Sequence, residues 1–113
     1  MRRRMMKSKI HRATVTGAEL DYAGSISLDT GLMKLADIRE FEQVAVLDVD
    51  NGNRFETYAI AGDPGQVQLN GAAARLVEPG HRVIVITYAD YDDSELADLH
   101  PLVVKVDSEN RPL

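Results

Sequence analysis

The sequence contains no cysteine among its 113 residues. This absence excludes a disulfide framework, a thiolate nucleophile and any zinc site built on sulfur. Long hydrophobic runs are also missing: the longest aliphatic stretches are residues 44–47 and 83–86, whereas a helix needs about 20 apolar residues to cross a bilayer. Hydrophobic residues make up 44% and charged residues 27% of the chain, which is typical of a single globular domain, here residues 1–113.

No acidic residue occurs before Glu19. The remainder is strongly acidic and the net charge is −5, which argues against nucleic acid as a partner because phosphate contacts need a basic face. The basic start has no apolar stretch like that of a secretory signal, although it also fits an organellar transit peptide. We expect Arg2 to Arg4 to be solvated end charges, and Lys9 and Arg12 to attract an anionic ligand.

The hydrophobic pattern is mostly that of short strands. Alternating and β-branched residues predict strands over residues 9–16, 25–28, 43–49, 54–60, 67–69, 82–88 and 102–106. Asn51-Gly52 is a strong hairpin signal between two of them. Short helices are predicted over residues 30–38, capped by Asp29 or Thr30, and over residues 70–76, while residues 90–100 form an acidic loop or helical turn. Many short strands in one small domain indicate a closed barrel.

The usual signatures of metal and phosphate sites are missing from this sequence. The three histidines, His11, His81 and His100, lie far apart, and the acidic residues 90–95 lack the glycine and glutamate positions of a calcium loop. The glycines are scattered and do not form a phosphate-binding loop. We therefore predict no metal site.

Five ordered motifs carry a resemblance that covers nearly the whole chain. They are residues 6–16 (MKSKIHRATVT), Tyr22-Ala23-Gly24-Ser25, Asn51-Gly52, Thr57-Tyr58-Ala59-Ile60 and the run from Asn70 to Ala74. Together they resemble the pyruvoyl-dependent aspartate 1-decarboxylase family. The resemblance implies a mainly β fold, a six-stranded double-psi β-barrel with short helices. It also implies a cytoplasmic enzyme that assembles as a homotetramer and needs neither nucleic acid nor membrane.

The resemblance further implies a chain that cuts itself between Gly24 and Ser25. The products are residues 1–24 (the β chain) and 25–113 (the α chain), and the new N-terminus carries a pyruvoyl group derived from Ser25. Glycine tolerates conformations closed to other residues, so Gly24 could hold the peptide strained for attack by the Ser25 hydroxyl. The attack needs hydrogen-bond donors for the oxyanion, and the family assigns this processing support to Thr57, Asn70 and Tyr22.

In the mature enzyme that the resemblance implies, the pyruvoyl ketone forms a Schiff base with L-aspartate and Tyr58 donates a proton to the carbon that loses CO₂. No metal or pyridoxal phosphate is required. Arg54 precedes Tyr58 by four residues on one predicted strand, so both side chains share a face and Arg54 can clamp a carboxylate. Substrate contacts are expected from Lys9, His11, Arg54, Thr57, Gly71, Ala72 and Ala73. The product is β-alanine, a precursor in pantothenate and coenzyme A biosynthesis.

Two other functions stay open at this point. One is a non-enzymatic double-psi barrel that binds an anionic metabolite or a protein, and the other is a related decarboxylase acting on glutamate. The chain departs from the family pattern at Asp21, Leu47 and His81 and in a short connection over residues 62–68. None of these departures touches Gly24, Ser25 or the other residues assigned to the reaction.

Overall fold

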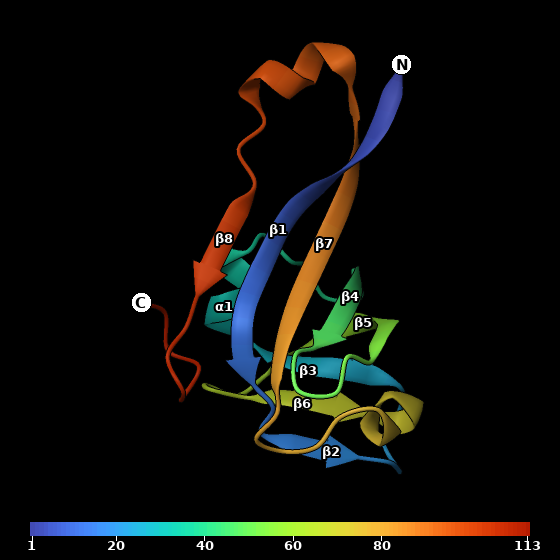
Figure 1. Ribbon diagram of the computed structural model, residues 1–113, viewed down its shortest axis with the longest axis vertical. Helices are drawn as coiled ribbons and strands as arrows, with labels where there is room; N and C mark the ends of the chain where they lie inside the picture. The colour runs from blue at the N-terminus through green and yellow to red at the C-terminus, as the bar shows by residue number, and fades with distance from the viewer.

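The computed structural model describes residues 1–113 as one row of strands with short helices between them (Figure 1). In chain order the elements are β1 (Arg2–Thr14), β2 (Gly17–Glu19), β3 (Ser25–Asp29), α1 (Thr30–Leu35), β4 (Gln43–Asp48), β5 (Arg54–Gly62), β6 (Val67–Asn70), the 3₁₀ helix η1 (Gly71–Arg75), β7 (Arg82–Asp92), the 3₁₀ helix η2 (Asp93–Asp98) and β8 (Leu102–Lys105). The prediction of a mainly β fold with short helices is confirmed.

The strands form an eight-stranded sheet in the order β2-β6-β3-β5-β4-β7-β1-β8. Hydrogen bonds do not close this row into a ring, but the chain itself links its far parts. Between β1 and β2, Val15 N donates to His81 O and Thr16 N donates to Val67 O, both at 2.8 Å. The residues between β1 and β2 therefore hydrogen-bond to the residue before β7 and to β6, and so link two distant parts of the row. This arrangement is compatible with a double-psi barrel, with eight strands in the row where six were predicted.

The core explains which strand can carry a protected polar site. In β4 the residues alternate, so Val44 and Val46 are buried and their neighbours are not. Strand β3 differs, because all four residues from Ser25 to Leu28 are buried. A buried hydroxyl without a hydrogen-bond partner costs free energy. Ser25 and Ser27 therefore need polar partners inside the fold.

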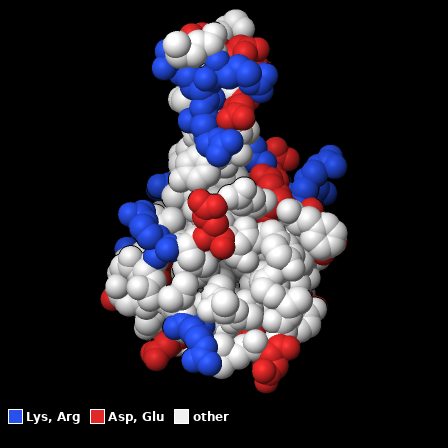
Figure 2. All heavy atoms as spheres, turned by 90° about the vertical axis from the view of Figure 1, so that its right-hand side faces the viewer, with Lys and Arg blue, Asp and Glu red and all other residues white.

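Strands β1 and β7 are longer than the sequence pattern predicted, and together they rise from the body as a two-stranded arm (Figure 1). Residues 2–8 and 89–92 extend the two predicted strands by antiparallel pairing from Arg2 opposite Asp92 to Ser8 opposite Thr87, and opposite charges also meet at the end of the arm. Arg3 Nε lies 2.7 Å from Asp93 Oδ1, and Arg4 Nε lies 3.2 Å from Asp90 Oδ1. Figure 2 shows basic and acidic side chains gathered at the end of the arm. Arg2 to Arg4 are exposed as expected, but they belong to a strand.

The predicted helices are present, with shifted ends. The Asp29 side chain caps α1 by accepting hydrogen bonds from Gly31 N and Leu32 N, and the helix ends at Leu35, three residues earlier than predicted. The predicted acidic turn begins only at η2, where Asp92 and Glu95 form a capping box. None of the helices is long and apolar enough to cross a membrane.

Candidate active site

Ser25 opens β3 and is fully buried. Its hydroxyl donates to Ala23 O at 2.9 Å and accepts a hydrogen bond from Asn70 Nδ2, also at 2.9 Å. These two partners fix the orientation of the Ser25 hydroxyl next to the Gly24–Ser25 peptide bond. Asn70, to which the resemblance assigns a part in the processing, is thus in direct contact with Ser25.

Asn70 is itself fully buried and uses both ends of its amide. Its Nδ2 also donates to Ser27 Oγ at 3.0 Å, and its Oδ1 accepts from Gln68 Nε2 at 2.8 Å. The antiparallel pairing of β3 with β6 sets Ser25 opposite Asn70 and Ser27 opposite Gln68. Gln68 and Ser27 escaped the sequence analysis, although their spacing of two from Asn70 and Ser25 puts each pair on one face of its strand.

The close approach at the Gly24–Ser25 junction comes from Gly71. Gly71 has a φ of +69°, and a Cβ there would lie 2.7 Å from Gly24 Cα and 2.9 Å from Gly24 N. Gly24 has no left-handed φ, and a Cβ built on it would meet nothing within 4 Å. The expected reason for glycine at position 24, a backbone conformation closed to other residues, is therefore wrong. The conformation that requires glycine is at position 71.

Strand β5 carries the next group of predicted residues. It runs parallel to β3 with Ile26 opposite Ala59, so extending the register by one residue sets Tyr58 beside Ser25. The Tyr58 ring packs on Phe41 with centroids 6.2 Å apart, and no hydrogen bond within the chain uses its hydroxyl. Arg54 begins the strand, is exposed and forms no ion pair. Strand alternation places Arg54 and Tyr58 on one face and Thr57 on the other.

Lys9 and His11 lie elsewhere in the molecule. Both belong to β1 between β7 and β8, with Lys9 opposite Ile86 and His11 opposite Lys105. Three strands separate β1 from β3 in the sheet order. Neither residue lies on a strand that pairs with β3, and no hydrogen bond or ion pair within the chain joins them to Ser25.

The remaining predicted site residues surround the junction. Tyr22 is exposed, and its carbonyl oxygen would lie 3.1 Å from a Cβ at Gly71. Gly71, Ala72 and Ala73 form the start of η1, as the sequence predicted, directly after Asn70. The site within one chain thus consists of the 22–25 junction, the end of β6 with the start of η1, and the neighbouring part of β5.

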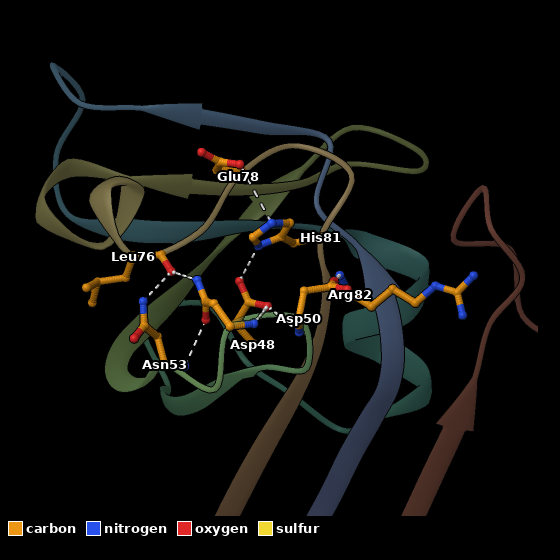
Figure 3. A network of polar contacts seen from close by, with 8 residues as sticks. Asp48, Asp50, Asn53, Leu76, Glu78, His81 and Arg82 are labelled. Atoms are coloured by element: carbon orange, nitrogen blue, oxygen red, sulfur yellow. Dashed lines mark hydrogen bonds and ion pairs between the residues drawn. The ribbon is translucent and has the colours of Figure 1, made fainter.

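A polar cluster that the sequence analysis missed holds the far end of η1 (Figure 3). Asn51 Nδ2 and Asn53 Nδ2, from the turn after β4, both donate to Leu76 O at 3.0 Å. At the end of β4 the fully buried Asp48 carboxylate accepts a hydrogen bond from Asp50 N at 2.8 Å and pairs with His81 Nδ1 at 2.7 Å. The β4–β5 turn is thereby tied to both ends of the 76–81 connection.

This cluster also gathers possible metal ligands, since ligand atoms of Asp48, Asp50 and His81 lie within 4.8 Å of one another. The interactions in the chain already account for them. Asp50 Oδ2 accepts from Arg82 N at 2.7 Å, while Asp48 holds the turn and His81. The three histidines are far apart in sequence, so nothing in their spacing could have indicated this pairing.

His81 gives the cluster a pH dependence. The hydrogen bond to Asp48 raises the pKa of His81 above its ordinary value of 6.5, and the charges of Asp48, Asp50 and Glu78 act in the same direction. A raised pKa means that the folded state binds the proton more tightly than the unfolded chain. The resulting stabilisation is complete below pH 6.5 and is lost as the pH rises through the raised pKa.

Replacing His81 by glutamine should therefore remove a pH-dependent part of the stability. We expect the difference in unfolding free energy between wild type and His81→Gln to be largest below pH 6.5 and to shrink above it, as measured by urea unfolding across this range. The matched control is His100→Gln, which removes a histidine outside the cluster. A difference between wild type and His81→Gln that stays constant with pH would contradict the assignment.

Comparison with known proteins gives one consistent result. Residues 1–113 match the aspartate decarboxylase family. The chain is 57% identical to an aspartate 1-decarboxylase of Kosmotoga olearia, a match that covers 100% of this chain and 98% of that protein. It is also 57% identical to an aspartate 1-decarboxylase of Acetivibrio thermocellus, over 95% of this chain and 86% of the relative. A Syntrophobacter fumaroxidans aspartate 1-decarboxylase is 55% identical over 100% of this chain and 93% of its own length.

Proposed function

Because the chain belongs to the aspartate decarboxylase family, we propose that it cleaves itself between Gly24 and Ser25 and then uses position 25 to decarboxylate L-aspartate. The activity is that of a carboxy-lyase: the substrate loses its α-carboxylate as CO₂ and leaves as β-alanine. The family relationship does not support the alternative of a non-enzymatic binding module. Glutamate as substrate is also disfavoured, since the relatives named above are aspartate 1-decarboxylases.

The observation that carries the self-cleavage is the fixed hydroxyl of Ser25 at a junction against which Gly71 is packed. In the first step the Ser25 oxygen adds to the Gly24 carbonyl carbon, the peptide C–N bond breaks, and the hydroxyl proton ends on the freed nitrogen. The product is an ester between Gly24 and Ser25. Asn70 Nδ2 holds the attacking oxygen, and Thr57, beside Gly24 by the extended register, is the family's candidate donor to the oxyanion.

The second step opens this ester. Loss of the Ser25 Cα proton breaks the bond between Ser25 Cβ and the ester oxygen, which releases Gly24 as a carboxylate and leaves an enamine at position 25. Water then replaces the nitrogen, which leaves as ammonia, and position 25 carries a pyruvoyl ketone. The side chains of Asn70 and Ser27 beside Ser25 are buried and uncharged, so an uncharged ketone fits at this position.

The pyruvoyl group supplies a ketone that binds the substrate amine and accepts the electrons released with CO₂. The chain's own residues do the rest. Tyr58 has a hydroxyl that no other group of the chain engages and stands one strand from Ser25, so we assign it the proton transfer to the substrate carbon. Arg54, on the same face and without an ion pair, is the proposed clamp for the remaining carboxylate.

Assembly of several chains is part of the proposal. Lys9 and His11 lie on β1, which three strands separate from β3 in the same chain, so we assign them as substrate contacts in the site of a neighbouring protomer. A homotetramer, as the family resemblance implies, would provide such neighbours. A cytoplasmic location and a place in pantothenate biosynthesis stay predictions of that resemblance.

Mass spectrometry under denaturing conditions tests the proposal. We expect two chains, residues 1–24 and residues 25–113, with the pyruvoyl mass at the start of the longer one. Ser25→Ala, which lacks the nucleophile, is expected to stay a single chain without decarboxylase activity. A wild-type protein that keeps one intact 113-residue mass after prolonged warming would contradict the cleavage.

A further inference from the structure

A cavity of about 270 Å³ lies where β1, the start of β7 and the C-terminal turn after β8 meet. None of its lining residues belongs to β3, β5 or η1, so within one chain it is separate from the Ser25 site, and of the proposed substrate contacts only His11 lies on its wall. Three cationic side chains line it, those of Arg12, Arg82 and Lys105, and none of them forms an ion pair within the chain. In a chain with a net charge of −5, three uncompensated cations around one cavity are unusual.

The carboxylates on the cavity wall do not neutralise these cations. Asp107 accepts backbone hydrogen bonds from Glu109 and Arg111 at 2.9 and 3.0 Å and pairs with Arg111 Nε at 3.4 Å. The backbone hydrogen bonds from Arg111 and Glu109 lower the pKa of Asp107, and the Arg111 charge adds to this. Leu113, the last residue, also lies on the wall, and its terminal carboxylate forms no ion pair. The cationic groups are therefore left without a partner.

The local backbone turns these cations toward the cavity. β1 carries a bulge between Ile10 and Ala13, where Arg12 takes a φ of +62°. Bulges redirect side chains, and a non-glycine residue in the left-handed region is often found at a ligand site. Figure 3 shows that Arg82 binds Asp50 through its backbone while its guanidinium points away from that cluster, across β1 toward the C-terminal segment.

The surroundings of His11 indicate a positive electrostatic potential in this cavity. It lines the cavity, and its Nδ1 is buried without a hydrogen-bond partner. Burial lowers the pKa of His11, and the nearby charges of Lys9, Arg12 and Lys105 lower it further. An anion that compensated these cations would favour the protonated form of His11 and raise its pKa.

We propose that this pocket binds a small oxyanion, a phosphate or a dicarboxylate, held by Arg12, Arg82 and Lys105. Guanidinium groups match the planar oxygen pairs of carboxylates and phosphates, and the Lys105 ammonium adds a compact charge. The Ser108 hydroxyl on the wall can donate a further hydrogen bond. The inference goes beyond the decarboxylation, because Arg12, Arg82 and Lys105, which would hold the anion, have no part in the proposed reaction. It also gives a ligand to Arg12, which the sequence analysis expected to attract an anion.

The three histidines make the test direct. Their ring signals can be titrated by NMR at constant ionic strength, first in chloride and then with inorganic phosphate added. Phosphate in the pocket should raise the pKa of His11 toward its ordinary value of 6.5, because the anion stabilises the imidazolium. His81 and His100 lie outside the cavity and serve as internal controls. Succinate, a dicarboxylate without an amine that could react at position 25, forms the second arm of the experiment.

The variant Arg82→Ala with Lys105→Gln should abolish the anion-induced shift, or weaken the apparent affinity for the anion at least about tenfold. Lys34→Gln, which removes an exposed cation of α1, is the matched control and should leave the shift unchanged. A shift with phosphate alone or succinate alone identifies the class of anion. No shift of His11 with either anion, equal shifts at all three histidines, or an undiminished shift in the double variant would overturn the proposal. None of these readouts depends on cleavage or decarboxylation.

Discussion

Replacing Tyr58 by phenylalanine is expected to lower kcat for aspartate decarboxylation about 10²-fold or more, because a positioned proton donor contributes a factor of this size. The substitution keeps the ring that packs on Phe41 and breaks no hydrogen bond within the chain. Folding and cleavage at the Gly24–Ser25 bond should therefore proceed as in wild type. The measurements are CO₂ release at saturating aspartate and the intact masses of the two chains.

Tyr88→Phe is the matched control for this prediction. Tyr88 is exposed on β7 and far along the sheet from Ser25, so losing its hydroxyl should change neither cleavage nor turnover. A fully cleaved Tyr58→Phe enzyme with wild-type kcat would remove Tyr58 from the proton transfer. Slower cleavage with unchanged turnover per cleaved chain would move its role to the processing step.

Replacing Gly71 by alanine should slow the self-cleavage at least about tenfold, which corresponds to about 1.4 kcal/mol in the barrier. The added Cβ would lie 2.7 Å from Gly24 Cα and 3.1 Å from Tyr22 O, so the backbone before Ser25 must shift. Alanine at a φ of +69° also costs about 1 to 2 kcal/mol of folding stability. The cleaved fraction over time, followed by mass spectrometry, measures the first effect, and urea unfolding measures the second.

Gly52→Ala separates the two effects. Gly52 has a φ of +79°, but a Cβ there meets nothing within 4 Å. This control should lose a similar free energy of unfolding and still cleave at the wild-type rate. If Gly52→Ala and Gly71→Ala cleave equally fast, the packing of Gly71 on Gly24 has no part in the processing.

Much of the fold could be predicted because it follows from local patterns. The alternation in β4, the Asn51-Gly52 turn and the Asp29 cap each involve residues close in sequence, and the structure contains all three. The arm could not be predicted in this way. From the sequence alone Arg3 and Arg4 look like solvated charges at the end of the chain. In the structure they pair with Asp93 and Asp90, and such pairing depends on the register between segments that are far apart in sequence.

The same difference between local patterns and distant contacts applies to the candidate site. The resemblance indicated Ser25 and Asn70, and in the structure a 2.9 Å hydrogen bond joins them. It gave no sign that Gly71, with its positive φ, is the glycine that the junction needs. The buried pair of Asp48 and His81 was missed because the two residues meet only after β4 and β7 are paired. For Lys9 and His11 the spacing correctly predicts that both side chains lie on one face of a strand. It does not show which site that face contacts.

The placement of residues 1–24 in the sheet bears on what happens after the proposed scission. β1 is an inner strand between β7 and β8, and β2 pairs with β6, so every partner of the short fragment belongs to residues 25–113. The two fragments therefore stay hydrogen-bonded to each other in the native state, and the cleavage breaks none of these strand pairings. Once denatured, however, they must find each other by diffusion, so refolding turns from a unimolecular into a bimolecular process that weakens on dilution. The durability of the processed protein then depends on how slowly it opens.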